Sequence, residues 1–361
     1  MNNGFNPNQN GYGGFNDNFY ANAFGAPPQL EGDIRRSFSR IGLSLFLYIT
    51  VSYIIAFAAQ FIILLVAGDP NKALVIFENP FVSAAVGILP MYAVGLPILY
   101  FVLRGMETRG RKPLKMGAKE FSMFFLIGIA LMYLGSFISE WLTSAYSLVF
   151  GYDLQNSTSA TIESWPIWLV FILVVVLGPL VEEFIFRKLL IDRLSVYGDK
   201  IAIIISAVVF GIHHGNFFQF FYAAFLGVVL GYMYVKTNRL RYSFLMHAIL
   251  NFIGSIVPMS LMEFFNEFSE LEQEIAAGGT VDMERYYLCF SVSAVYSVIM
   301  FGMMIAGAVI LGLKFKKFRL DPYCRIDIPR GRAFSLVTFN VGFILFILAS
   351  CAIFGMSLIP A

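Results

Sequence analysis

The sequence has few charged residues and few cysteines. Charged residues make up only 13% of its 361 residues, whereas a soluble globular chain usually carries about a quarter. Hydrophobic residues make up 58%, and the mean hydropathy is +0.73. This composition excludes a chain whose whole surface faces water and indicates an integral membrane protein. Three cysteines without paired spacing exclude a disulfide framework and a cysteine-based metal site.

The beginning of the chain lacks the apolar stretch of a signal peptide, so we expect no cleavable signal. Its first 30 residues contain eight Asn and five Gly among scattered aromatic residues. Such a biased polar composition cannot build a packed core. We therefore predict a disordered, cytoplasmic Asn/Gly-rich tail over residues 1–36, followed by a single transmembrane helical domain over residues 37–361.

Nine segments are apolar over roughly the 20 residues that a membrane-spanning helix needs. They are 41–67, 81–103, 121–150, 165–188, 201–214, 217–235, 242–262, 288–313 and 334–359. The fifth is short for a span, so it is either tilted, extended by its flanks or stopped within the protein. The sequence predicts an all-α fold, a polytopic transmembrane helix bundle of about nine spans.

Lys and Arg are concentrated in alternate loops of this bundle. The 104–119 loop contains six of them and the 314–332 segment seven, whereas the 151–164 loop contains none. Basic residues favour the cytoplasmic side of a membrane, so we expect a cytoplasmic N-terminus in a multi-pass protein of a prokaryotic cell membrane. The formal net charge of +2 gives no reason to expect a nucleic-acid partner; membrane lipid is the expected surrounding.

Two acids and a base lie inside the fourth apolar segment, where charged groups are costly and usually functional or paired. Glu183 and Arg187 are four residues apart with the acid first, the favourable order for a helical ion pair. Glu182 points about 100° away from Glu183 on a helix and has no local cation. We therefore interpret Glu183 and Arg187 as a structural pair and Glu182 as the candidate base.

The three histidines of the chain all fall within residues 213–247, inside apolar segments. His214 shares a helical face with Phe210, four residues earlier, and His247 shares a face with Asn251. His213 is rotated away from His214. A lone histidine on an apolar helix is more often a packed core residue than a catalyst, but this clustering favours a functional site.

These residues form three motifs that occur in order on successive apolar helices. They are Glu182-Glu183-x-x-x-Arg187, Phe210-x-x-x-His214 and His247-x-x-x-Asn251. Their spacing and order resemble the CAAX protease and bacteriocin-processing (CPBP, or Abi) membrane proteases, whose eukaryotic members are the Ras-converting CAAX endopeptidases. The resemblance covers about 165–258 and implies that this region is the catalytic core of an intramembrane endopeptidase.

The resemblance also implies roles for the motif residues. Glu182 would activate a water with help from His214, His247 and Asn251 would stabilise the oxyanion of the tetrahedral intermediate, and Glu183 and Arg187 would orient the site. This agrees with the general needs of amide hydrolysis, a base for the water and donors for the oxyanion.

A metal is a second hypothesis for the same residues. The chain lacks the HExxH signature of helical zinc sites, but Glu182, His214 and His247 would make a His₂Glu set for zinc or another divalent ion. We favour a site without a tightly bound metal, although three residues on three helices leave the choice open at this point.

Two other functions compete with proteolysis. A transporter could use a buried Glu/His relay, although no internal repeat supports one. A non-catalytic immunity or binding relative would lack a motif residue, and none is missing. We expect a membrane-associated or lipidated peptide or protein as substrate, of the CAAX type or of the bacteriocin or pheromone type.

Overall fold

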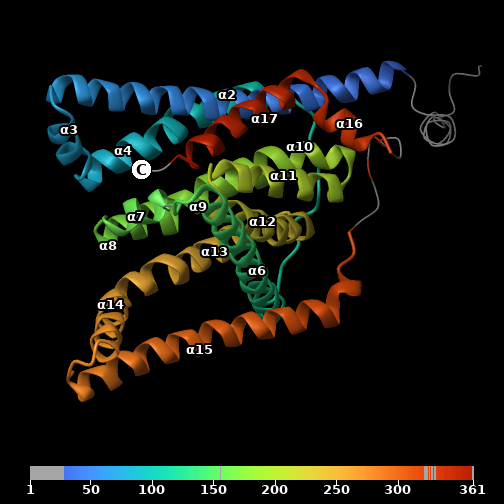
Figure 1. Ribbon diagram of the computed structural model, residues 1–361. Coiled ribbons are helices and arrows are strands. Elements are labelled where there is room, and N and C mark those ends of the chain that lie inside the picture. The colour runs from blue at the N-terminus through green and yellow to red at the C-terminus, as the bar shows by residue number, and fades with distance from the viewer. Residues whose placement is uncertain are drawn as a thin grey trace, which may run out of the picture.

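The computed structural model describes residues 28–154, 156–320, 324, 326, 328 and 331–359. Every regular element in these ranges is a helix (Figure 1), which confirms the predicted all-α fold. Most of the predicted disordered tail lies outside the described residues. Residues 28–36, which the sequence places in that tail, belong instead to the first described helix.

The first half of the chain forms helices of 6 to 40 residues. They are α2 (Pro28–Ala67), α3 (Pro70–Phe77), α4 (Pro80–Leu89), η1 (Pro90–Gly95), α5 (Leu96–Leu103), α6 (Ala118–Phe150) and α7 (Ser157–Glu163). The next stretch is one continuous helix made of several pieces. These are α8 (Ile167–Val170), η2 (Phe171–Leu177), α9 (Gly178–Glu183), η3 (Phe184–Ile191), α10 (Asp192–Leu194) and η4 (Ser195–Tyr197).

The second half of the described chain is also helical. Its helices are α11 (Asp199–His213), α12 (Phe217–Thr237), α13 (Leu240–Asn251), η5 (Phe252–Ile256), α14 (Val257–Ala276), α15 (Met283–Lys314), η6 (Phe315–Lys317), α16 (Ala333–Thr338) and α17 (Val341–Met356). Four pieces, η1, η2, η3 and η5, are π-helical, and η4 and η6 are 3₁₀ turns.

Seven helical segments of the described chain are long and apolar enough to cross a membrane. They are Leu30–Ala67, Pro80–Leu103, Ala118–Phe150, Ile167–Tyr197, Phe217–Thr237, Leu240–Ala276 and Met283–Lys317. The predicted fifth and ninth spans correspond to shorter helices, α11 with 15 residues and α17 with 16. A polytopic helix bundle is therefore confirmed, while the count of nine spans and the cytoplasmic N-terminus stay predictions.

Two helices continue beyond the ends that hydropathy predicts. The fourth apolar segment does not stop at Lys188, because the charges that follow are neutralised locally: Lys188 pairs with Asp192 at 2.7 Å, and Arg193 donates to the carbonyl of Leu103 at 2.9 Å. The acidic 263–287 segment is mostly the end of α14 and the start of α15. Glutamate is a good helix former, so it extends a helix past its apolar part.

The helices form a layered bundle (Figure 1). α17 packs along α2 at one edge of the view, and α15 lies at the opposite edge. Between them α11 packs on α12, α12 packs on α6, and α6 packs on α15. The segment from α8 to η4 contacts α5, α11, α12 and α13.

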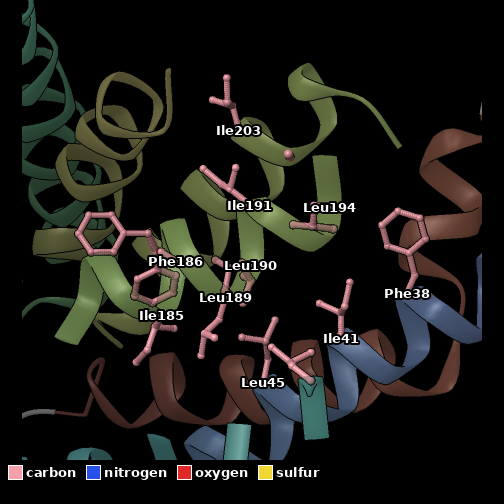
Figure 2. Packing of buried hydrophobic residues seen from close by; sticks show 14 of the residues in the cluster. Phe38, Ile41, Leu45, Ile185, Phe186, Leu189, Leu190, Ile191, Leu194 and Ile203 are labelled. Atoms are coloured by element: carbon pink, nitrogen blue, oxygen red, sulfur yellow. The ribbon is translucent and has the colours of Figure 1, made fainter. Parts of the chain in front are cut away.

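The largest apolar core surrounds η3. Figure 2 shows side chains of η3 and α2 pointing toward one another. The labelled members are Phe38, Ile41 and Leu45 of α2, Ile185, Phe186, Leu189, Leu190 and Ile191 of η3, Leu194 of α10 and Ile203 of α11. All are at most 4% exposed, so the helix that carries the two glutamates is held firmly on one side.

Glycines allow α2 and α17 to approach closely. A Cβ added at Gly342 would overlap the backbone of Ser39, and one added at Gly42 would overlap the backbone of Phe343. Small residues at helix contacts are a common means of packing in membranes, where dispersion contacts replace the hydrophobic effect.

We expect Gly342→Ala to lower the stability of the protein by about 1–3 kcal/mol, because the added methyl group forces the two backbones apart. Gly355→Ala is the matched control in the same helix, since nothing lies within 4 Å of a Cβ there. Thermal unfolding of the purified protein in detergent measures both. Equal melting temperatures for the two variants would contradict the close contact.

Candidate active site

The two glutamates lie on α9, a single α-helical turn between the π-helical segments η2 and η3. Such π-helical segments are rare and are found frequently at functional sites. Pro179 explains the local distortion, because proline has no N–H and its ring clashes with the preceding turn. η5 also lies next to a proline, because the helix that follows it begins with Val257 and Pro258.

Glu183 and Arg187 form the predicted ion pair. The Arg187 Nε lies 3.1 Å from the Glu183 Oε2, and both side chains are 0% exposed. The Arg187 Nη1 also donates to Ser206 Oγ at 3.0 Å, and this hydroxyl donates to the carbonyl of Phe186 at 2.8 Å. The pair therefore connects the glutamate helix to α11 inside the protein.

His247 of α13 lies between the two glutamates. Its Nδ1 is 3.1 Å from the Glu183 Oε1, and its Nε2 is 3.6 Å from the Glu182 Oε2. The Glu183 carboxylate accepts from Arg187, so it acts as an acceptor toward His247 too, and Nδ1 carries the hydrogen. The Glu183 side chain thus fixes the ring with Nε2 directed at Glu182.

His214 is oriented by a backbone carbonyl. Its Nδ1 lies 2.9 Å from the carbonyl oxygen of Phe210. A carbonyl can only accept, so Nδ1 is the donor and Nε2 of the neutral ring is an acceptor.

The Phe210 ring makes contacts with three polar side chains of the site. It contacts the rings of His214 and His247 edge-on, with centroid distances of 5.0 Å and 5.6 Å. The Arg187 guanidinium lies 5.1 Å from the centroid of the same ring. This explains physically why an aromatic residue stands one turn before His214: it separates the two histidines and covers the buried cation.

Asn251 replaces a hydrogen bond that Pro179 cannot make. Its Nδ2 donates to the carbonyl oxygen of Val174 at 2.8 Å. In η2 the N–H of Gly178 bonds to the carbonyl of Leu173, five residues earlier. The next bond of that series would join residue 179 to Val174, but proline has no N–H. One N–H of the Asn251 amide satisfies the orphaned carbonyl, and the second is left for a ligand.

Four of the predicted residues line one cavity of about 470 Å³, namely Glu182, His214, His247 and Asn251. Glu183 and Arg187 are not among its lining residues. The Glu182 side chain is 16% exposed, against 0% for Glu183. The structure thus separates the neighbouring acids as helical geometry predicts, with Glu182 in the cavity and Glu183 behind it.

His213 lies outside this cavity lining, on the side of α2. Its ring stacks on Tyr48 at 5.6 Å and contacts Phe186 at 5.3 Å. The predicted rotation separates the two residues with respect to the cavity, because His214 lines it and His213 packs against Tyr48 and Phe186, although the two histidine rings still meet edge-on at 5.8 Å.

The polar lining residues that were not predicted from the sequence include Tyr92, Gln219 and Tyr222. The Tyr92 hydroxyl would lie 3.6 Å from a Cβ at Gly178, which places it beside the glutamate turn. A polar residue deep in an apolar span is the signal that could have found Tyr92. The motif spacing gave no such signal, because these residues come from other helices or from the start of α12.

The side chains do not form a metal site as they are placed. The described residues contain no group of three or more His, Cys, Asp or Glu side chains that could hold a metal ion. The Nδ1 atoms of His247 and His214 are engaged by Glu183 and by the Phe210 carbonyl, which leaves the Nε2 atom of each ring available. We therefore derive no chemical step through a metal.

Comparison with known proteins confirms the resemblance. Residues 164–253 match the family described as type II CAAX prenyl endopeptidase Rce1-like. The chain is 25% identical over 187 residues to YdiL of Bacillus subtilis, assigned as a membrane peptidase, which covers 50% of this chain and 76% of that protein. It is 28% identical over 177 residues to the membrane-embedded CAAX protease MroQ of Staphylococcus aureus, covering 45% and 68%.

No solved structure matches the chain significantly. The matched region contains all six predicted site residues, and the relatives are bacterial membrane peptidases. Together with the apolar helices, these matches support a multi-pass membrane protease of a prokaryotic membrane.

We expect Arg187→Met to destabilise the protein by about 3–5 kcal/mol, because it leaves Glu183 as an unpaired buried charge. Adding Glu183→Gln to the same chain should recover part of this loss. Lys200→Met is the control, since it removes an exposed lysine of α11. Thermal unfolding in detergent checks all three variants. If Arg187→Met melted like Lys200→Met, the ion pair would not stabilise the site.

Proposed function

We propose that this chain is an intramembrane endopeptidase in which Glu182 activates a water to hydrolyse a peptide bond. One observation carries the proposal: Glu182, His214, His247 and Asn251, from three helical segments, line a single cavity. The Glu183–Arg187 pair is sealed behind that cavity. A base, two imidazoles and an amide donor around one space are what amide hydrolysis needs.

In this proposal Glu182 and His214 position the attacking water. The Glu182 carboxylate and the Nε2 of neutral His214 are both acceptors, so a water between them donates both of its hydrogens. Its free lone pair then faces the carbonyl carbon of a peptide bound in the cavity. Glu182 takes one proton as the new C–O bond forms.

His247 and Asn251 stabilise the negative charge that develops on the carbonyl oxygen. Asn251 offers the N–H that Val174 does not use. His247 offers an Nε2–H when its ring is protonated. In that state the two positive charges of Arg187 and His247 balance the two negative charges of Glu182 and Glu183. Glu182 then passes its proton to the leaving nitrogen, so the C–N bond breaks into a carboxylic acid and an amine.

The cavity suits an apolar peptide. Beyond the four site residues its walls are rich in aliphatic side chains and methionine, with a few hydroxyl groups. They include Ile88, Met132, Leu226, Leu250 and Met262. We therefore propose a membrane-associated peptide or protein segment as the substrate.

Glu182→Gln should lower the cleavage rate of a membrane-anchored peptide reporter by at least about 100-fold, because the amide cannot accept the proton of the water. The variant should melt like the parent, since Glu182 is not part of the buried ion pair. Glu140→Gln is the control: it removes an exposed carboxylate of α6 that does not line the cavity. Full activity of Glu182→Gln would refute the proposed base.

Cleavage should continue when divalent metals are removed, because the proposed water is activated by side chains alone. The purified protein is treated with a strong zinc chelator, dialysed, and assayed against the same reporter. A loss of activity that added zinc restores would instead assign Glu182, His214 and His247 as a metal site.

A further inference from the structure

The cavity occupies one end of the helix bundle. In α12 its lining residues run from Gln219 to Leu226, and the remaining turns before Lys236 contribute none. In the segment from α8 to η4 the last lining residue is Glu182, although the helix continues to Tyr197. Each of these helices lines the cavity with the part remote from its basic end.

The helices that run the other way show the same asymmetry. α13 begins beside Arg241, and its lining residues start at His247 and continue through η5 into α14. α11 begins at Asp199 and lines the cavity only with Phe210 and the following His214. The proposed site residues therefore lie at the closed end of the cavity, its floor, rather than halfway along it.

The structure is packed solid behind this floor. Glu183 and Arg187 are 0% exposed, and Met246, one residue before His247, is also 0% exposed. Next come the η3 side chains that pack against α2 and α11. A peptide chain has no passage through this region, because it would have to displace the largest core of the protein.

The opposite end of the cavity is a mouth formed by α7 and α14. α7 contributes Thr158, Ser159 and Glu163, and α14 contributes Met259 and Met262. Thr158 and Ser159 are half-buried, and Glu163 is exposed. A helical rise of about 1.5 Å per residue places Ile167, just after α7, roughly 20 Å from Glu182. About six residues of extended chain span that distance.

The mouth lies at the end of the bundle where the loops lack basic residues. The 151–164 loop that contains α7 has no Lys or Arg, whereas the 104–119 loop at the other end of α6 has six. Basic loops mark the cytoplasmic side. The mouth is therefore at the side that the charge distribution predicts as extracytoplasmic.

We infer that the proposed protease takes its substrate from the extracytoplasmic side, through the mouth between α7 and α14. This inference rests on the proposed function and narrows its substrate class. The cavity fits an exported peptide or the outer part of a membrane-spanning segment, with the cut about six residues inside the mouth. A lipidated C-terminus on the cytoplasmic surface would meet the sealed end.

Cysteine labelling in intact cells tests on which side of the membrane the mouth lies. The background is a variant with Cys289, Cys324 and Cys351 replaced that still cleaves the reporter. Ser159→Cys at the mouth is compared with Lys115→Cys, an exposed position in the basic loop. A membrane-impermeant maleimide should label the Ser159→Cys variant in intact cells and the Lys115→Cys variant only after the cells are opened.

The same adduct tests whether the mouth is the entrance. A bulky maleimide on the Ser159→Cys variant should abolish cleavage by blocking the cavity, while the adduct on the Lys115→Cys variant should leave the rate unchanged. If Ser159→Cys does not fold, Glu163→Cys takes its place. Labelling of the mouth only in opened cells, or full activity of the blocked variant, overturns the inference.

Two reporters complete the test and keep the two proposals separate. One carries the cleavable segment at the extracytoplasmic end of its single span, and the other carries it at the cytoplasmic end. Only the first should be cut, and Glu182→Gln should abolish that cut. Cleavage of the cytoplasmic reporter alone, still abolished by Glu182→Gln, would overturn the entry side and leave the proposed chemistry standing. Activity of Glu182→Gln on either reporter would instead refute the chemistry.

Discussion

The carboxylate of Glu183 binds two helices at once, through Arg187 one turn along its own helix and through His247 of α13. An isolated charge at this depth would cost several kcal/mol, so both partners are needed to keep it ionised. Because Arg187 also reaches Ser206 of α11, three helices are held at fixed positions around one buried ion pair. The orientation of His247 toward the cavity follows directly from this arrangement.

Backbone distortion supplies the second constraint. Pro179 interrupts the hydrogen bonds of its helix just before the two glutamates, and Asn251 repairs the interruption from α13. The amide that repairs the helix is then placed beside Glu182 with one N–H unused. A structural need and a proposed chemical role are thus met by the same side chain, which would explain why Asn251 lies one turn after His247.

Much of this site follows from the sequence, because charges and histidines are so rare in the apolar helices that their spacing is informative. The i, i+4 spacing of Glu183 and Arg187 predicts their pairing, and helical rotation separates Glu182 from Glu183. The π-helical segment η2 could not be predicted, since it depends on the hydrogen bond that Asn251 of another helix donates to Val174. Tyr92 was missed for a related reason: only the folded bundle brings η1 next to α9.

The extent of the helices was predicted less well than their existence. Hydropathy ends the fourth segment at Lys188, but Asp192 and Arg193 are buried because Lys188, Tyr234 and backbone carbonyls satisfy them. Similarly, the acidic residues after α13 continue a helix rather than form a loop. In both cases polar partners or helix propensity override the apolar pattern on which the prediction depends.

The pairing of α17 with α2 has a consequence for the time at which the site forms during synthesis. All the proposed site residues have been translated once the chain reaches Asn251, yet the core around η3 also needs Phe343 and Phe346 of α17. A nascent chain therefore holds its glutamates and histidines in an unfinished framework until α17 is inserted. The order of translation would thus delay the proposed activity until α17 has been made.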